Sequence, residues 1–345
     1  DGGTGGSDGL LIYPASGASQ IVEVSAADSA GTTSAVTYGK AVAYAHLDPQ
    51  SFYDASDLAN PVITGSVFDD TIRVYADSGT LRIERGSSTY AIGSAQLADL
   101  ASLRIEGRAG HDTIDVESLP AGYGGGDGAD LLIYGSRLPA SGPPVPEDDQ
   151  FVDRANIEGS ISLNGGFLDV WADRIDVADG VTVQTVDNDI VLRARLIAIA
   201  ELENKIPLAY GTDHEVDITI GANAQLIASG IWLVAQAEDK SLADVLGTTK
   251  EVDNFVIQPL MGKLEDLIAL PVKVLVKYST ANITLEQGAK LLGTGTVGLY
   301  ATAAADASGA AKGSLFSIGY AQAVGSADIS IASGVLIDAA EAVEV

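Results

Sequence analysis

Residues 217–226 (DITIGANAQL) hold the pattern that decides the fold, because the pattern recurs twice further along the chain. The second copy is 282–291 (NITLEQGAKL) and the third is 328–337 (DISIASGVLI). Each copy begins with Asp or Asn, alternates aliphatic residues with Ser or Thr, breaks at a turn of small residues and resumes with apolar residues. Strict alternation places one set of side chains inward and the other outward on a β-strand. The repeat therefore predicts short strands with one buried face.

Related strands surround these copies. A looser copy occupies 174–183 (RIDVADGVTV), and a second short strand follows the first two copies at 231–235 (IWLVA) and 297–301 (VGLYA). The copies start 65 and then 46 residues apart. A solenoid tolerates such unequal spacing, because insertions can leave the stack of repeats as loops. We therefore predict an all-β fold, a right-handed parallel β-helix (β-solenoid) with loop and short-helix insertions.

Composition changes once along the chain. Residues 142–149 (GPPVPEDD) are rich in Pro and acid and show no apolar period, which is typical of a linker or exposed loop. We expect a Gly/Asp-rich β-solenoid region with calcium-binding turns over 1–145 and β-helix repeats over 146–345. Two insertions, at about 238–277 and 303–327, account for the extra length of the second region.

Each insertion leaves a question open. In the first, the apolar spacing predicts a short helix between Pro259 and Pro271, which either packs against the side of the β-helix or binds a partner. The second consists of small, weakly polar residues. Its composition fits a close-packed flat pair of strands or a loop.

The composition excludes several classes of protein. The chain of 345 residues has a formal net charge of −28, is 46 % hydrophobic and contains no Cys. The apolar fraction argues against disorder, and the lack of Cys excludes disulfides and Cys-ligated metals. Nucleic acid is a poor partner for so negative a surface. No run approaches the ~20 apolar residues that a membrane-spanning helix needs, and we interpret the chain as a segment of a longer protein.

The turns of the first region point to calcium. Residues 125–133 (GGDGADLLI) fit the nonapeptide G-G-x-G-x-D-x-U-x in full, where U is apolar. Residues 107–115 (GRAGHDTID) have Arg in place of one Gly, and 65–73 (GSVFDDTIR) keep the first Gly, the Asp and the apolar position. Calcium takes six to eight oxygen ligands, which Asp carboxylates and the carbonyls of Gly-rich turns can supply.

The spacing of the two better copies suggests a shared ion. Two nonapeptides form one coil of a calcium-binding β-roll, so that turns on one side recur every 18 residues, and Asp112 and Asp130 are 18 residues apart. We therefore predict that these two carboxylates stack with calcium between them. The predicted ligand residues are Asp70, Gly110, Asp112, Gly126, Gly128 and Asp130. The alternative is that these Asp-Gly turns merely reverse the chain.

These stretches resemble a known kind of protein. Residues 103–116 (LRIEGRAGHDTIDV) are similar to the strand–turn–strand phrase of very large, repetitive bacterial surface and secreted proteins, with Arg108 and His111 as departures. Those proteins combine degenerate repeats-in-toxin-like calcium turns with filamentous-haemagglutinin-like β-helix. The resemblance implies export, calcium-dependent folding outside the cell and a role as an adhesin or structural filament. The partners it implies are calcium ions, neighbouring copies of the chain or cell-surface glycans.

A carbohydrate-binding or carbohydrate-cleaving β-helix is the main alternative. Catalysis would need carboxylates on one exposed face. The candidates are Asp169, Asp173, Asp176 and Asp179, around Trp171, which could stack on a sugar. The same residues also fit a solvated strand face followed by a turn. We therefore expect no enzyme activity, and a passive spacer is the third possibility.

Overall fold

A computed structural model gives the fold. It describes residues 32–37, 40–45, 59–65, 69–86, 88–108, 110–126, 128–136, 152–199, 210–240, 272–305 and 318–345. The regular elements in these ranges are strands, apart from the four-residue helix α1 (Ser94–Leu97). The prediction of an all-β fold is confirmed. None of the helices in the described ranges is long and apolar enough to cross a membrane.

The described strands form three large, mostly parallel sheets and one separate hairpin, β1 (Thr32–Thr37) with β2 (Lys40–Ala45). The nine-stranded sheet has the order β22 (Ile318–Ile331), β19 (Val272–Leu285), β16 (Tyr210–Ile220), β13 (Arg174–Val177), β10 (Arg154–Ile157), β8 (Thr113–Val116), β4 (Thr71–Asp77), β5 (Thr80–Arg85) and β6 (Ser88–Ile92). The five-stranded sheet has the order β11 (Ile161–Ser162), β14 (Thr182–Gln184), β17 (Gln225–Ala228), β20 (Lys290–Gly293) and β23 (Leu336–Ala339). The eight-stranded sheet has the order β24 (Ala342–Glu344), β21 (Thr296–Ala304), β18 (Ile231–Lys240), β15 (Ile190–Ile199), β12 (Leu168–Ala172), β9 (Asp130–Ser136), β7 (Ser102–Arg108) and β3 (Val62–Thr64).

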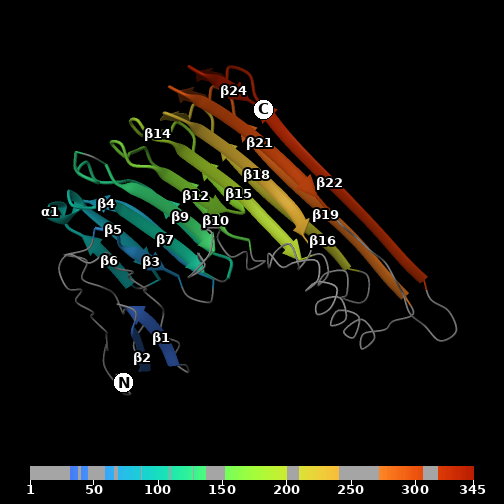
Figure 1. The fold of residues 1–345 in the computed structure, drawn as a ribbon, viewed down its shortest axis with the longest axis horizontal. Coiled ribbons are helices and arrows are strands. Elements are labelled where there is room, and N and C mark those ends of the chain that lie inside the picture. Colours follow the sequence, from blue (N-terminus) through green and yellow to red (C-terminus); the bar gives the residue numbers. More distant parts are fainter. Residues whose placement is uncertain are drawn as a thin grey trace.

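From β10 onward the chain visits the nine-, five- and eight-stranded sheets in turn and repeats this passage five times. We call one passage a coil. The strands of each coil pair in parallel with those of the next, so that successive coils lie side by side (Figure 1). Parallel strands are ~4.8 Å apart, and each coil therefore covers the apolar row of its neighbour. The resulting cluster of buried apolar side chains is continuous from Ile63 to Leu299.

The repeats of the sequence are in register, residue for residue. Asp217 pairs with Asn282, and Asn282 pairs with Asp328. The following aliphatic residues, Ile218 and Ile283, are fully buried. The second strands also align as predicted, since 231–235 pair in register with 297–301. The alternating pattern thus predicted both the buried face and the pairing.

The unequal spacing of the repeats arises from long strands. β15, β18 and β21 continue past the corner at which shorter coils turn, and β16, β19 and β22 begin correspondingly early (Figure 1). The ends of both insertions are therefore strands of two different sheets. A Cβ on Gly325 of β22 would lie 3.0 Å from the carbonyl oxygen of Ala303 in β21, so the two sheets approach closely here. The helix expected between Pro259 and Pro271 lies outside the described residues.

The two regions of the sequence share sheets. β8 of the first region pairs with β10 of the second, and β9 pairs with β12. The stretch 142–149 between them lies outside the described residues. Near the other end, β5 and β6 add to the edge of the nine-stranded sheet in antiparallel pairs.

Candidate functional site

The glycine–aspartate motifs of the sequence lie at one corner of the fold. Asp70, Asp112, Asp153 and Asp173 each immediately precede a strand of the nine-stranded sheet and occupy the same position in successive coils. We call these four residues the aspartate corner. Asp112, Asp153 and Asp173 are at most 4 % exposed. Burial of this kind is rare for carboxylates and requires hydrogen-bond donors around them.

Backbone N–H groups supply donors. The N–H of Asp70 donates to Asp112 Oδ1 at 2.8 Å, and the N–H of Asp112 donates to Asp153 Oδ1 at 3.0 Å. The N–H of Asp153 donates to Asp173 Oδ2 at 2.7 Å. Each side chain thus supplies the acceptor that a neighbouring strand would supply in a regular sheet. The corner therefore connects coils through charge-assisted hydrogen bonds.

Glycine is required next to these aspartates. Gly65, Gly107 and Gly135 end the preceding strands of the eight-stranded sheet or follow them directly. A Cβ on Gly107 would lie 2.1 Å from the Gly135 carbonyl oxygen and 2.5 Å from Asp112 Oδ2, and one on Gly65 would lie 2.0 Å from the Gly107 carbonyl oxygen. The Gly-x4-Asp spacing at 65–70 and 107–112 therefore serves the close approach of one coil to the next.

The predicted stacking of Asp112 with Asp130 is wrong. Asp112 precedes a strand of the nine-stranded sheet, whereas Asp130 begins β9 of the eight-stranded sheet. Asp130 pairs with Ser102, and its carboxylate accepts the N–H of Phe167 at 2.8 Å. The spacing of 18 residues misled because the aspartates that do stack are 42, 41 and 20 residues apart.

The remaining predicted ligand residues have positions of their own. Asp70 belongs to the aspartate corner, and the buried Gly110 lies two residues before Asp112 with a φ of 121°. Gly126 and Gly128 lie in the turn before β9. A Cβ on Gly128 would lie 2.3 Å from the carbonyl oxygen of Leu163 in the next coil, so this glycine permits packing of backbone on backbone.

These residues do not fit the calcium site that the sequence predicted. The glycine positions are explained by close packing of coils, and the carboxylates accept backbone N–H groups from neighbouring coils. Across the ranges that the structure describes, no three His, Asp or Glu side chains converge in a way that could hold a metal ion.

The acids of the carbohydrate alternative do not form one face. Asp173 is buried at the aspartate corner, and Asp179 accepts the N–H of Ala222 in a turn at 2.8 Å. Asp176 lies on β13 in the nine-stranded sheet, whereas Asp169 lies on β12 in the eight-stranded sheet. Of the four, Asp169 contacts Trp171, whose Nε1–H donates to its Oδ1 at 3.1 Å.

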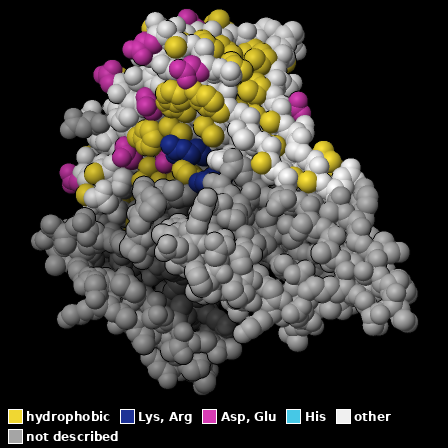
Figure 2. Space-filling view, turned by 45° about the vertical axis from the view of Figure 1, so that its right-hand side comes forward, with side chains coloured by type: hydrophobic (Ala, Val, Ile, Leu, Met, Phe, Trp, Pro, Cys, Tyr) yellow, Lys and Arg dark blue, Asp and Glu magenta, His cyan; other side chains and the backbone are white. Residues whose placement is uncertain are grey.

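Asp169 and Trp171 belong to a larger cluster on the outer side of the eight-stranded sheet. Neighbouring positions in register there are Tyr134, Trp171, Arg193, Val234 and Tyr300 in one row, and Asp169, Val191, Trp232 and Gly298 in the adjacent row. We call these residues the aromatic face. Figure 2 shows a surface of this kind, on which apolar side chains gather around a small basic group and acidic side chains lie along the border.

One half of the aromatic face is centred on Trp171. The guanidinium groups of Arg193 and Arg195 lie over its ring, at 4.9 Å and 5.6 Å from the centroid. Arg193 also forms an ion pair with Asp169, to which the Tyr134 hydroxyl donates at 3.4 Å. Burial raises the pKa of Asp169, and the nearby Arg193 opposes that shift. The charges of this half are therefore paired within the face.

The other half consists of two stacked rings. Trp232 and Tyr300 have centroids 6.3 Å apart and planes within 10° of each other. Gly298 makes room for them, since a Cβ there would lie 2.6 Å from Trp232 Cε3 and 2.7 Å from Tyr300 Cε2. The Tyr300 hydroxyl donates to Glu344 on the next strand. The sequence analysis missed this pair. Its signal was an aromatic residue at an outward position of each of two aligned repeats.

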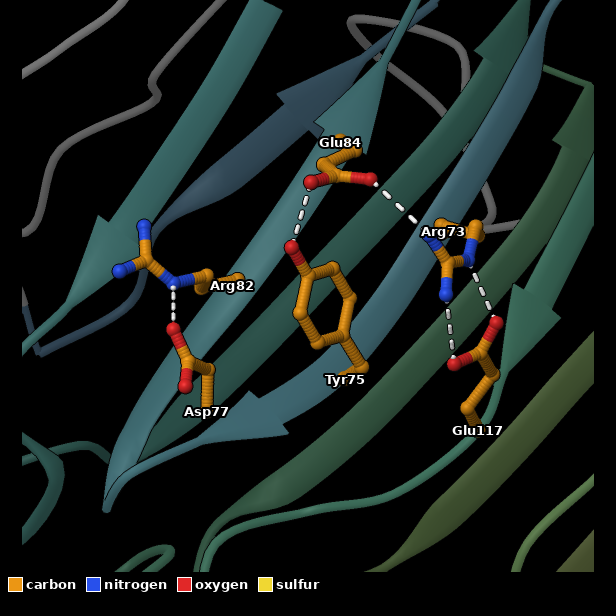
Figure 3. A network of polar contacts seen from close by, with 6 residues as sticks. All are labelled: Arg73, Tyr75, Asp77, Arg82, Glu84 and Glu117. Atoms are coloured by element: carbon orange, nitrogen blue, oxygen red, sulfur yellow. Dashed lines mark hydrogen bonds and ion pairs between the residues drawn. The ribbon is translucent and has the colours of Figure 1, made fainter.

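A third polar cluster, shown in Figure 3, links the antiparallel strands to the first coils. Arg73 on β4 donates to Glu117 at 2.9 Å and to Glu84 on β5 at 3.2 Å, and Glu84 also accepts the Tyr75 hydroxyl. Arg82 donates to Asp77 at 2.7 Å. Every charge drawn has a partner of opposite sign, so we assign this cluster to positioning of β4 and β5.

This assignment predicts a small, pH-dependent effect. The hydrogen bond from Arg73 holds the pKa of Glu117 below its usual range. A carboxyl whose pKa is lowered by folding stabilises the fold above its unfolded pKa and loses that contribution as pH falls through the folded pKa. Glu117→Gln is expected to lower the urea midpoint slightly at neutral pH, because the pair is exposed. The difference from wild type should disappear in acid, and a difference that grows in acid would contradict the assignment.

Comparisons of the chain with protein-family models, with curated proteins and with solved structures found no match.

Proposed function

We propose that this chain is a structural or adhesive segment of a large extracellular bacterial protein, folded as a right-handed parallel β-solenoid. The observation that carries the proposal is the residue-for-residue register of the repeats through parallel sheets around one core. Stacks of this kind gain length by adding coils, and they present broad, flat sheets as binding surfaces. Both properties suit a protein that extends from a cell or attaches it to a surface.

The charge and composition support the same proposal. A net charge of −28 keeps an elongated, exposed protein soluble, and the lack of Cys removes any dependence on the redox state outside the cell. The carboxylates that could have formed a catalytic face are divided between two sheets and two corners. The aspartate corner is therefore best explained as a structural device.

Antibody labelling of the source cells tests the location. An antibody raised against the purified segment is expected to label intact cells, and protease added outside should remove the label. A cytoplasmic protein labelled in parallel controls for leaking cells. Labelling that requires permeabilised cells would contradict the proposed location. Deletion of residues 152–345 should reduce attachment of the cells to surfaces if the segment is adhesive.

Thermal unfolding with and without calcium tests the role of the metal. Because the aspartate corner makes its hydrogen bonds to backbone without a cation, we expect nearly equal midpoints in calcium and in excess chelator. A calcium site that is saturated at 100 times its Kd would add about 2.7 kcal/mol. Such an addition would raise the midpoint by several degrees. A rise of that size, absent from the double variant Asp112→Ala, Asp130→Ala, would overturn the expectation.

A further inference from the structure

The outer side of the eight-stranded sheet carries more aromatic surface than folding requires. Trp232 lies between Ile231 and Leu233, both fully buried in the core, so the strand is anchored without the indole. Tyr300 is likewise preceded by the fully buried Leu299 and is itself 36 % exposed. Large aromatic side chains gathered on an outer face mark binding surfaces more often than isolated apolar residues do.

The two rings are held in place before any ligand binds. Gly298 leaves space for Trp232 against β21, the ring of Tyr300 stacks on it, and Glu344 fixes the Tyr300 hydroxyl. With planes within 10° of each other, the rings offer a flat and nearly continuous surface. A preorganised surface loses little side-chain entropy on binding.

The charge of the face selects the chemistry of the ligand. Arg193 is paired with Asp169 and lies over Trp171, so the basic group that borders the rings is already neutralised in part. The protein as a whole carries a net charge of −28, which repels anionic polymers at long range. An uncharged ligand avoids both costs. Aromatic faces carry negative partial charge and attract the positive C–H groups of such a ligand.

The size of the face argues against a protein partner. A stable protein–protein interface involves roughly 20–30 residues a side, whereas the aromatic face comprises fewer than half as many. The face is long rather than round, since Tyr134 and Tyr300 lie four strand spacings apart, about 19 Å. A linear polymer matches that shape.

We propose that the aromatic face binds a neutral polysaccharide, with the apolar faces of its pyranose rings stacked on Trp232 and Tyr300. Gln236 and Thr302, which pair in register beyond these rings, offer hydrogen bonds to sugar hydroxyls at the border. The inference deepens the proposed adhesive function by naming the ligand class. It rests on the adhesive role, although the binding itself can be measured on the purified chain.

Affinity electrophoresis tests the proposal. The full chain is run through native gels that contain a neutral polysaccharide, either hydroxyethylcellulose, galactomannan or soluble β-1,3-glucan. Polygalacturonate serves as the anionic comparison. At least one neutral polysaccharide is expected to retard the chain, and Trp232→Ala and Tyr300→Ala should each weaken retardation about tenfold or more, the equivalent of 1.4 kcal/mol. Tyr278→Ala is the matched control, because Tyr278 is 44 % exposed on the nine-stranded sheet.

The other outcomes would overturn the proposal. Retardation by polygalacturonate alone would replace the neutral ligand with an anionic one. Retardation that survives both aromatic substitutions would place the binding elsewhere. Concentration-dependent sedimentation that Trp232→Ala abolishes would identify a second copy of the chain as the occupant. Thermal unfolding of each variant checks that it is folded. Absence of retardation in every gel would remove the glycan site but leave the cell-surface location, which antibody labelling tests separately.

Discussion

Gly128→Ala is expected to lower the free energy of unfolding by about 2–5 kcal/mol, or to prevent folding. Two costs contribute. Gly128 has a φ of +77°, where an L-residue costs about 1–2 kcal/mol. The added Cβ would also lie 2.3 Å from the Leu163 carbonyl oxygen and 2.4 Å from the Gly166 nitrogen. Overpacking of a well-packed site costs about 1–3 kcal/mol more, and here the obstacle is backbone of the next coil.

Gly126→Ala is the matched control, since it lies in the same turn and was predicted to take part in the same calcium site. A Cβ on Gly126 would meet no heavy atom within 4 Å in the described part of the chain, and its φ is outside the positive range. We expect its unfolding midpoint in guanidinium to stay close to that of the wild type. A calcium-binding turn that needs both glycines would make the two variants equally unstable in calcium, and that result would contradict the packing explanation.

The contrast between these glycines shows why the sequence predicted the fold better than the site. Alternation at 217–226, 282–291 and 328–337 fixes which side chains are buried, and the three copies pair as their alignment predicts. Burial of a repeated apolar row dominates the free energy, so the sequence pattern and the structure agree.

The Gly-x4-Asp motif is ambiguous in a way that the sequence cannot resolve. Glycine admits close backbone approach and positive φ, and Asp supplies oxygen, whether those oxygens face a cation or a backbone N–H. At Asp112 the acceptor oxygen serves the N–H of Asp70. The spacing between Asp112 and Asp130 then matched a β-roll by coincidence, because the coils here vary in length.

The aromatic face was hidden for a related reason. Outward positions are predictable within one strand, so Trp232 and Tyr300 could each be placed on an outer surface. Their contact depends on which residues of β18 and β21 pair, and those strands are separated by the insertion at 238–277. The aligned repeats 231–235 and 297–301 already contained that register, and Gly298 beside the two rings was the further signal.

Asp153→Ala is expected to lower the free energy of unfolding by about 2–3 kcal/mol. The substitution leaves the buried N–H of Asp112 without the acceptor that now lies 3.0 Å away. Loss of a hydrogen bond to a charged group, with a buried donor left behind, costs about 1.5–3 kcal/mol. Asp176→Ala is the control on the outer side of the same sheet, where we expect a change within about 0.5 kcal/mol. Guanidinium unfolding followed by circular dichroism measures both.

Asp153→Asn separates the two explanations of the aspartate corner. Asparagine keeps an oxygen for the Asp112 N–H and removes one negative charge from a row of carboxylates in neighbouring coils. If the corner works as an acceptor of backbone hydrogen bonds, Asn should retain most of the stability that Ala loses, in calcium and in chelator alike. If a cation holds the carboxylates together, loss of the charge matters, and Asn should be as unstable as Ala in calcium. The wild type would then fall to the level of both variants when chelator is added.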